Sequence, residues 1–282
     1  RAIEVPGIEQ VDARIQRRVD GGDALAAVVG AIEIGHAHAA KAQRRHLLRP
    51  VRAERGPRSV RAPRRGPALR GPFRDPPASA EALTVEADVT QEGEVAEYVR
   101  AAVDKFGTID VFYNNAGIEG DIKPIWEYSL ESFRRVIDVN VVGVFLGMKH
   151  VLPVMLKQNK GSIINTASIA GLMGSPKIAV YSASKHAVIG LTKTASWECT
   201  GTGVRVNCVC PGLIDSRMLS TILQGRNGGN EPPPQDKIVD RIPARRLGQP
   251  SEVAAIVAFL ASDDASYVSG SHYTVDGGRT AA

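Results

Sequence analysis

The chain has 282 residues, of which 43% are hydrophobic and 23% charged, a composition typical of a globular protein with one large or two small domains. It contains no run of 18 or more apolar residues, which predicts that no helix spans a membrane. Its three cysteines, Cys199, Cys208 and Cys210, are too few and too clustered for a disulfide scaffold. They indicate a reducing compartment, so we expect a cytoplasmic protein.

The net charge of +5 hides two regions of opposite character. Residues 1–80, which we call the head, contain 16 lysines and arginines against 8 aspartates and glutamates. Residues 81–282, the body, contain 19 against 22. The basic character therefore belongs to the head alone, and we expect no nucleic-acid footprint on the body.

The head shows little regular patterning. Residues 41–75 contain eleven arginines and five prolines, which exclude a long helix or an inner strand. The apolar run at residues 24–34 is compatible with a short buried strand, and residues 35–48 with a helix that Pro50 would end. Residues 1–20 lack an apolar core and carry four acidic residues, so we expect neither a secretory signal nor a transit peptide.

The body alternates between two hydrophobic periods. Apolar runs predict strands at residues 83–87, 109–113, 162–166, 204–209 and 271–275. Amphipathic stretches predict helices at residues 92–106, 130–158, 181–198 and 251–262, the last with Ser251 as N-cap. Residues 213–243 form a polar insertion rich in proline and glycine, which we expect to cover a substrate. The alternation predicts an α/β fold, with a parallel sheet between two helical layers.

Small and polar residues follow several predicted strands, at the sheet edge where parallel folds bind ligands. Asn114-Asn115-Ala116-Gly117 would let a planar ligand approach the backbone, although a simple turn has the same composition. Asp88-Val89-Thr90 also follows a strand, but Asp88 alone would serve as a helix N-cap. Pro211-Gly212 is equally compatible with an ordinary loop.

Four residues further along are candidates for acid–base chemistry. Tyr181 and Lys185 share one face of a helix, where an ammonium is expected to lower the pKa of a phenol, unless both are merely solvated. Ser168 follows a strand and would either hold a substrate oxygen or cap a turn. Asn140 lies among apolar residues of a helix, where its amide would either distort the helix or hold a water.

The sequence does not support a metal site. We expect His150 and His186 to be partly buried structural residues rather than catalytic bases. Cys208 and Cys210 are expected on opposite faces of their strand, which would make them core residues and poor metal ligands. The remaining histidines are scattered, without the spacing of a zinc site.

The order and spacing of these motifs together resemble the short-chain dehydrogenase/reductase family, NAD(P)-dependent oxidoreductases built on a single Rossmann-type domain, a doubly wound parallel sheet. The resemblance covers residues 81–280 and includes the motifs above. It also includes Gly143 and the C-terminal segments Arg246-Leu247-Gly248-Gln249-Pro250 and Val275-Asp276-Gly277-Gly278.

The resemblance implies interconversion of a secondary alcohol and a ketone through a four-residue proton relay: Asn140, Ser168, Tyr181 and Lys185. Tyr181 would exchange the proton, Lys185 would lower its pKa and bind the nicotinamide ribose, Ser168 would polarise the carbonyl, and Asn140 would hold a water. It further implies an NAD or NADP site, formed with Tyr181 and Lys185 by Asp88, Val89, Asn115, Ala116, Gly117, Pro211, Gly212, Ile214 and Ser216. A small-molecule alcohol or ketone and a homotetramer are the implied partners.

The head departs from the family pattern. The expected Thr-Gly-x-x-x-Gly-x-Gly turn, which would hold the pyrophosphate, has no match in the head. Gly30 and Gly35 are five residues apart, and Glu33 between them would place a negative charge beside the phosphate. Without the first two strands, the sheet would have a gap at its centre. We therefore treat the head as an atypical segment in place of the first βαβ unit. Our hypothesis is a frameshifted or mis-started product, joined near Ala80.

Two alternative functions remain open at this stage. One is an inactive family member that cannot hold a dinucleotide because the glycine-rich loop is missing. The other is a basic head that binds nucleic acid on an oxidoreductase scaffold, although Phe73 is the one aromatic residue in 41–75 and base stacking is poorly supported. The insertion indicates a medium-sized, partly apolar substrate, and the run at residues 116–120 resembles members that act on cyclic alcohols. Reduction of an oxoacyl group on an acyl carrier protein is also compatible with the sequence.

Overall fold

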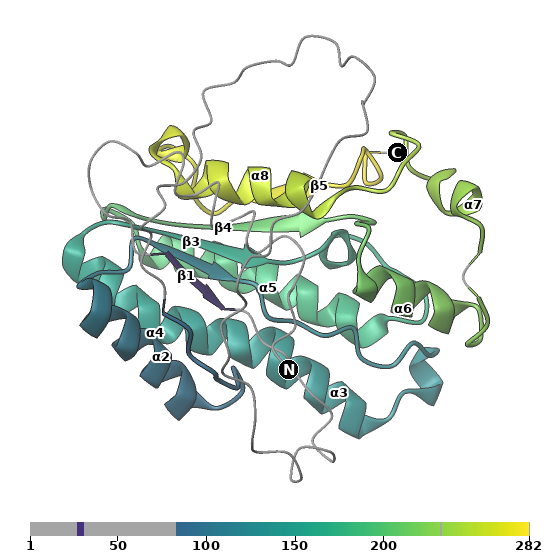
Figure 1. Ribbon diagram of the computed structural model, residues 1–282, viewed down its shortest axis with the longest axis horizontal. Helices are drawn as coiled ribbons and strands as arrows, with labels where there is room; N and C mark the ends of the chain where they lie inside the picture. The colour runs from purple at the N-terminus through teal and green to yellow at the C-terminus, as the bar shows by residue number, and fades with distance from the viewer. Residues whose placement is uncertain (1–26, 31–82, 232, 282) are drawn as a thin grey trace, which may run out of the picture.

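The computed structural model describes residues 27–30, 83–231 and 233–281 (Figure 1). Their strands form one five-stranded parallel sheet in the order β1-β2-β3-β4-β5. The strands are β1 (Ala27–Gly30), β2 (Val111–Asn114), β3 (Gly161–Thr166), β4 (Val204–Pro211) and β5 (His272–Val275). The last four coincide with predicted strands to within two residues, which confirms the parallel α/β prediction for the body.

Helices cover both faces of this sheet. Their bounds are α2 (Glu92–Phe106), α3 (Leu130–Ile137), α4 (Gly143–Gln158), α5 (Ala179–Glu198), α6 (Arg217–Arg226), α7 (Gln235–Val239) and α8 (Pro250–Ala261). In Figure 1, α8 lies on one side of the sheet and α2, α4 and α5 lie on the other. This three-layer arrangement is the doubly wound architecture that the sequence predicts.

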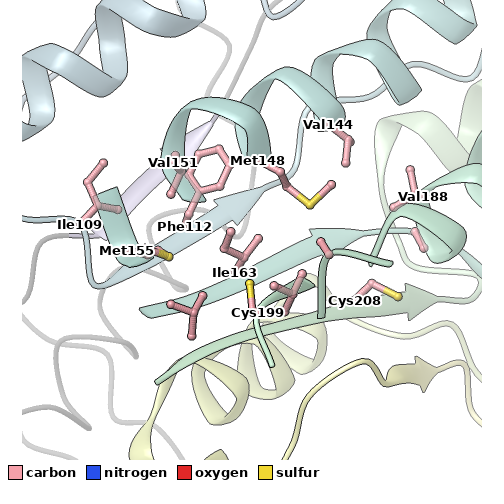
Figure 2. Packing of buried hydrophobic residues seen from close by; sticks show 14 of the residues in the cluster. Ile109, Phe112, Val144, Met148, Val151, Met155, Ile163, Val188, Cys199 and Cys208 are labelled. Atoms are coloured by element: carbon pink, nitrogen blue, oxygen red, sulfur yellow. The ribbon is translucent and has the colours of Figure 1, made fainter. Parts of the chain in front are cut away.

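Alternate residues of each strand divide the core into two clusters. Phe112 of β2 and Ile163 of β3 pack with α4 and α5 (Figure 2), whereas Ile164 of β3 packs with α8 on the opposite face. Cys208 and Cys210 of β4 both lie in the first cluster. The expectation that they point to opposite faces is wrong, because residues two apart on a strand share a face.

The first strand corrects the expectation of a gap in the sheet. β1 lies within the apolar run of the head and pairs in parallel with β2, with Gly30 opposite Asn114. The position beside β2 is therefore occupied. The predicted helix at 35–48 and the remainder of the head fall outside the described residues.

The strand predicted at residues 83–87 is wrong. The segment has no regular secondary structure, and Leu83 and Val85 are 41% and 37% exposed. None of the five described strands pairs with it. A β-strand depends on hydrogen bonds to a neighbour, and an apolar sequence alone does not supply one.

The predicted helix at 130–158 is continuous but changes its winding at its centre. A π-helical segment, η2 (Asp138–Val142), joins α3 to α4. By length and composition, Leu130–Gln158 is long and apolar enough to cross a membrane, with a mean hydropathy of 1.7. The sequence-based expectation of no such helix counted only uninterrupted apolar runs and therefore did not detect it. Half of its most apolar window is buried inside the described fold, as in the core helix of a globular domain.

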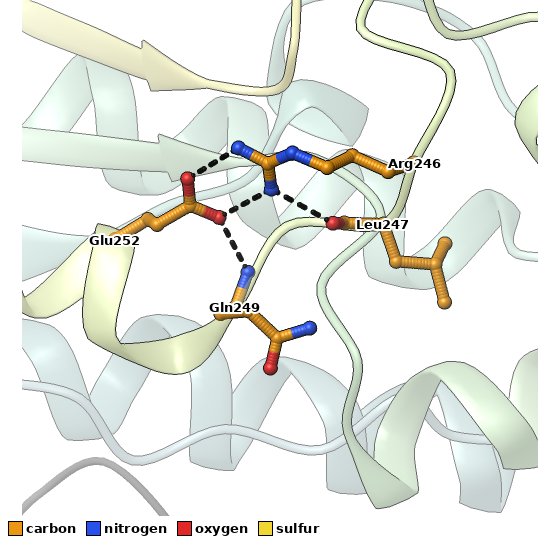
Figure 3. Close-up of polar contacts among 4 residues, drawn as sticks. All are labelled: Arg246, Leu247, Gln249 and Glu252. Carbon is orange, nitrogen blue, oxygen red and sulfur yellow. Dashed lines mark hydrogen bonds and ion pairs between the residues drawn. The ribbon is translucent and has the colours of Figure 1, made fainter. Parts of the chain in front are cut away.

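Helix α8 begins one residue earlier than predicted. Its N-cap is Gln249 rather than Ser251, and Pro250 occupies the first helical position, where no backbone N–H is needed. The Glu252 carboxylate accepts a hydrogen bond from the Gln249 backbone N–H at 2.8 Å and forms an ion pair with Arg246 at 2.7 Å (Figure 3). The Arg246–Pro250 motif therefore acts as a helix-capping device.

Candidate active site

The candidate residues converge where β2, β3 and β4 end. Parallel pairing places Asn114 opposite Asn165, and Thr166 opposite Val209, so the three strands end at the same edge. The Asn114 amide donates to the Val144 carbonyl at 2.9 Å, which ties the end of β2 to α4. This edge is where parallel sheets bind ligands.

Lys185 is the most buried charged group at this edge, with 2% of its surface exposed. Its Nζ donates to the Thr166 carbonyl oxygen at 2.8 Å and lies 5.5 Å from the centre of the Tyr181 ring. The Thr166 hydroxyl donates in turn to Asn115 Oδ1 at 2.9 Å. A short hydrogen-bonded chain therefore connects the candidate lysine to the loop after β2.

Gly117 lies against the same ammonium. A Cβ atom at this position would lie 3.4 Å from Lys185 Nζ and 3.4 Å from Asn140 Oδ1. A Cβ would therefore touch both polar groups, and the glycine leaves that volume free. The structure thus brings Gly117, Asn140 and Lys185 together, although they come from three separate segments.

The Tyr181 phenol is 8% exposed. Burial raises the pKa of this phenol to about 12. A hydrogen bond with Ser168 lowers the pKa by a smaller amount, and the nearby Glu119 carboxylate raises it. The direction is opposite to the sequence-based expectation. Desolvation of the phenolate outweighs any effect of the ammonium, because the charged form loses its hydration on burial.

Burial acts on Lys185 in the opposite sense. It lowers the pKa of the ammonium to about 8, because the charged form is the one that burial disfavours. Thr166 supplies the one hydrogen-bond acceptor for Nζ in the described part of the chain. An ammonium has three N–H groups, so donors remain available for a ligand.

Asn140 is fully buried within the π-helical segment. Its Oδ1 accepts from the Ile118 backbone N–H at 2.8 Å, and its Nδ2 donates to the Ile118 carbonyl at 2.9 Å and to Ser184 Oγ at 3.0 Å. Of the two readings left open by the sequence, these contacts support the structural one. Both Nδ2 hydrogens are donated to protein groups. A water molecule would therefore bind this side chain only by donating a hydrogen bond to Oδ1.

Ser168 is buried beside Tyr181 and begins the short helix η3 (Ile169–Gly171). Its Oγ accepts from the Ala170 backbone N–H at 3.1 Å and approaches the Pro211 carbonyl at 3.4 Å. The capping role weighed from the sequence is therefore present. The same hydroxyl is also placed next to the Tyr181 phenol.

The Asp88 segment lies further along the same edge. Asp88 Oδ1 accepts from the Thr90 backbone N–H at 2.9 Å, whereas the N-cap of α2 is Gln91, so Asp88 is not the helix cap. Val89 packs with Ala116 and Val139 in a small buried cluster. A hollow of about 470 Å³ is lined by Asp88, Thr90, Leu130, Glu131, Arg134, Arg135, Asp138 and Val139.

The loop after β4 is held by the C-terminal motif. The Gly248 backbone N–H donates to the Leu213 carbonyl at 3.0 Å, and the Asp215 N–H donates to the Gly248 carbonyl at 2.9 Å. Gly212 lies so close to Asp276 that a Cβ would be 2.7 Å from the aspartate Cβ. Ser216 is the N-cap of α6, where its Oγ accepts from the Leu219 N–H at 3.3 Å.

An apolar wall faces Tyr181 and was not predicted as a unit. Tyr181 forms a buried cluster with Ala170 and Ile178, against which Ile122, Met218 and Ile222 pack. Met218 and Ile222 come from α6, within the predicted substrate insertion. The apolar residues of that insertion were the available sequence signal, but which of them face the tyrosine depends on the tertiary fold.

The two histidines do not join the site. His150 is half-buried and lies 3.2 Å from Glu92 Oε1, whereas His186 is exposed and lies 2.9 Å from the Ser182 carbonyl. The burial prediction is confirmed for His150 and wrong for His186. Within the described residues, no group of three or more His, Cys, Asp or Glu is placed to hold a metal ion.

Comparison with known proteins identifies the class to which this fold and site belong. A family model described as enoyl-(acyl carrier protein) reductase matches residues 74–280. Levodione reductase of Leifsonia aquatica is 41% identical over 72% of this chain and 76% of its own length. Cyclohexanol dehydrogenase of an Acinetobacter species is 42% identical over 71% of this chain and 75% of its own length.

Solved structures agree with this assignment. The crystal structure of levodione reductase superimposes with a TM-score of 0.69 over 72% of this chain and 79% of its own. NAD⁺-bound xylitol dehydrogenase gives 0.65 at 36% identity, covering 68% and 77% of the two chains. NADP-bound ElxO gives 0.64 at 36% identity, covering 70% and 77%.

The chain belongs to the short-chain dehydrogenase/reductase family. It is an oxidoreductase that acts on CH–OH groups and uses NAD or NADP. The sequence-based recognition is thereby confirmed for the body, and the matched region begins a few residues before the boundary at residue 81.

Proposed function

We propose that this protein interconverts a secondary alcohol and a ketone, with Tyr181 exchanging the proton and with Ser168, Lys185 and Asn140 supporting it. One observation carries the proposal: the buried Tyr181 phenol lies beside Ser168 and Lys185 at the sheet edge where parallel folds bind ligands.

The residues present fit a dinucleotide. Lys185 retains ammonium donors beyond its bond to Thr166, and the absence of a side chain at Gly117 leaves space against them. We propose that Lys185 binds the nicotinamide ribose and that Asn115, Ala116 and Gly117 line the dinucleotide. Pro211, Gly212, Ile214 and Ser216 would flank the nicotinamide, and Asp88 and Val89 would meet the adenine next to their hollow.

The proton chemistry follows from burial. With a pKa raised to about 12, Tyr181 is neutral at physiological pH and is therefore a proton donor, as ketone reduction requires. When bound, a reduced nicotinamide supplies the hydride that forms the new C–H bond. Tyr181 gives its proton to the carbonyl oxygen, whose π electron pair becomes the new O–H bond, and the nearby Lys185 ammonium stabilises the resulting tyrosinate. Alcohol oxidation reverses each transfer.

The apolar and exposed side chains of the body bear on the substrate and on the oligomeric state. The apolar wall supports a medium-sized ketone with apolar surface, cyclic ketones and alcohols included. Exposed Phe145 on α4 and Trp197 on α5 support a homotetramer built through these helices. The free cysteines Cys199, Cys208 and Cys210 support a reducing, cytoplasmic location. We further propose that the chain consists of an atypical head, residues 1–80, and a family body, residues 81–282, in which residues 213–243 cover the substrate.

The test begins with binding. The purified chain is titrated with NADH and NADPH while nicotinamide fluorescence is followed, and saturable binding is expected. Failure to bind either nucleotide would favour the inactive family member described above. Reduction of cyclohexanone is then measured with the nucleotide that binds more tightly.

Replacing Tyr181 with Phe should lower kcat by about 10²- to 10⁴-fold, the contribution typical of general acid catalysis. The fully exposed Tyr267 gives a matched control, because Tyr267→Phe removes the same hydroxyl away from the site. Equal rates for the wild type and Tyr181→Phe would remove Tyr181 from its proposed role.

A further inference from the structure

Arg226, the last residue of α6, carries a charge that no carboxylate of the described residues compensates. Its Nη2 donates to Ser175 Oγ at 2.6 Å, and its Nε is buried without a hydrogen-bond partner in the described part of the chain. The guanidinium is half-buried, and no carboxylate within residues 83–231 and 233–281 forms an ion pair with it. A desolvated, unpaired cation is costly unless an anion is supplied.

Two further cations adjoin Arg226. The Lys177 ammonium donates to the Arg226 carbonyl at 3.0 Å. The pKa of Arg226 is lowered mainly by burial and, to a smaller extent, by the positive charge of nearby Arg279. Neither Lys177 nor Arg279 has a carboxylate partner among the described ion pairs. The protein therefore concentrates positive charge here, where like charges repel one another.

This cationic cluster lies next to the apolar wall. Arg226 follows Ile222 by four residues on α6, so the two share one face of the helix, about 6 Å apart along its axis. Ile222 packs against the cluster that contains Ile178 and Tyr181, and Lys177 directly precedes Ile178. The helix is pressed against the same wall at Gly225, where a Cβ would lie 2.5 Å from Ile122.

We propose that Arg226, assisted by Lys177 and Arg279, binds an anionic group at the end of the substrate opposite the carbonyl. The substrate class is then a ketone or secondary alcohol joined through a compact apolar segment to a carboxylate, sulfonate or phosphate. The carbonyl lies at Tyr181, the apolar segment lies on the wall, and the anion lies at Arg226. This inference rests on the proposed function for the position of the carbonyl. A guanidinium suits the task because its planar N–H groups pair with two oxygens of one anion.

The experiment compares 4-oxocyclohexanecarboxylate with its methyl ester, which differ in charge at one end of the same ring. We expect the wild type to show a kcat/KM for the acid about tenfold or more above that for the ester. Arg226→Gln should lower this acid-to-ester ratio by about tenfold, and Arg226→Lys should retain part of it. Arg217→Gln removes an equal charge from the exposed start of α6 and should leave the ratio unchanged.

A wild-type ratio near one, or an equal ratio in the wild type and Arg226→Gln, would overturn the anion site while ketone reduction itself remained established. If neither ketone is reduced, binding is measured through thermal unfolding with cyclohexanecarboxylate, because a ligand of the native state raises Tm. A rise in Tm for the wild type that is lost in Arg226→Gln would support the anion site even though the proposed reaction had failed. No rise in the wild type would overturn it.

Discussion

The two sides of Tyr181 are built differently. On one side, Lys185 and Asn140 are nearly or fully buried and are hydrogen-bonded to backbone groups and a serine hydroxyl. On the other side, the apolar wall is assembled from separate segments and completed by Met218 and Ile222, which are only partly buried. The proposed proton-transfer groups are thus attached to the sheet edge, whereas the proposed substrate contacts lie partly on helix α6, whose side chains can change without disturbing that edge.

Replacement of Lys185 by Met should have the largest effect on the polar side. We expect kcat/KM for ketone reduction to fall by about 10²-fold or more, because the proposed ribose contact and the proposed stabilisation of the tyrosinate would both be lost. Steady-state kinetics check this, with the exposed Lys193→Met of the same helix as the control. Full activity in Lys185→Met would show that the buried ammonium takes no part in the reaction.

The same replacement should change stability in the opposite direction. The pKa of Lys185 is about 8 in the folded chain and 10.5 in the unfolded chain, so below pH 8 the fold carries an ammonium that burial disfavours. Lys185→Met should therefore be more stable at pH 7 by about 1–2 kcal/mol, after allowance for the donor lost to Thr166. The advantage should shrink as pH rises from 8 to 10.5, where the wild type loses its proton. Urea unfolding at pH 7 and pH 10 measures the difference.

Asn140→Ala should be the most destabilising change on the polar side. It removes three hydrogen bonds and leaves the partly buried Ile118 backbone groups without these partners, at a cost of about 2–4 kcal/mol. Chemical denaturation measures this cost. The exposed Asn230→Ala is the matched control and should change stability little. An unfolding free energy equal to that of the wild type would show that the π-helical segment does not depend on the amide.

Ile222→Ala should affect the apolar side alone. Shortening this side chain removes contact surface, so we expect KM for a cyclic ketone to rise by about tenfold with a smaller change in kcat. The partly buried Leu223, which follows on the same helix and is not part of the wall, provides the control Leu223→Ala. A fall in kcat with constant KM would mean that the two sides are not separable.

Glu119→Gln should produce the smallest effect. After burial, which is the main cause, the Glu119 carboxylate raises the pKa of Tyr181, so its removal should lower that pKa. Because reduction uses the neutral phenol, the alkaline limb of the rate profile should move to lower pH. A pH–kcat profile measures the shift, and movement to higher pH would contradict the proton-donor role.

The sequence predicted the body well where one local pattern settled each element. Alternating apolar runs and amphipathic stretches located β2, β3, β4 and β5, and helices α2, α4, α5 and α8. It failed at residues 83–87, whose apolar pattern is that of a strand but which none of the described strands pairs with. It also failed at Cys208 and Cys210, which share one face of β4.

For the site, the positions of the polar groups were predictable but their surroundings were not. The motifs indicated Tyr181, Lys185, Ser168 and Asn140, and the structure brings them to one end of the sheet. The sequence could not show that Ser184 and the Ile118 backbone occupy the Asn140 amide. Nor could it show that Arg226 lies one turn beyond a residue packed against the cluster around Tyr181.

The sequence by itself determined strands β2 to β5 and helices α2, α4, α5 and α8 of the body, and which chemical groups follow those strands. These depend on hydrophobic period and residue type, which are local properties of the chain. Only the tertiary structure decided the direction of the Tyr181 pKa shift, the makeup of the apolar wall and the lack of a carboxylate partner for Arg226 among the described residues. Burial and charge compensation are set by neighbours far away in the chain, and no local pattern records them.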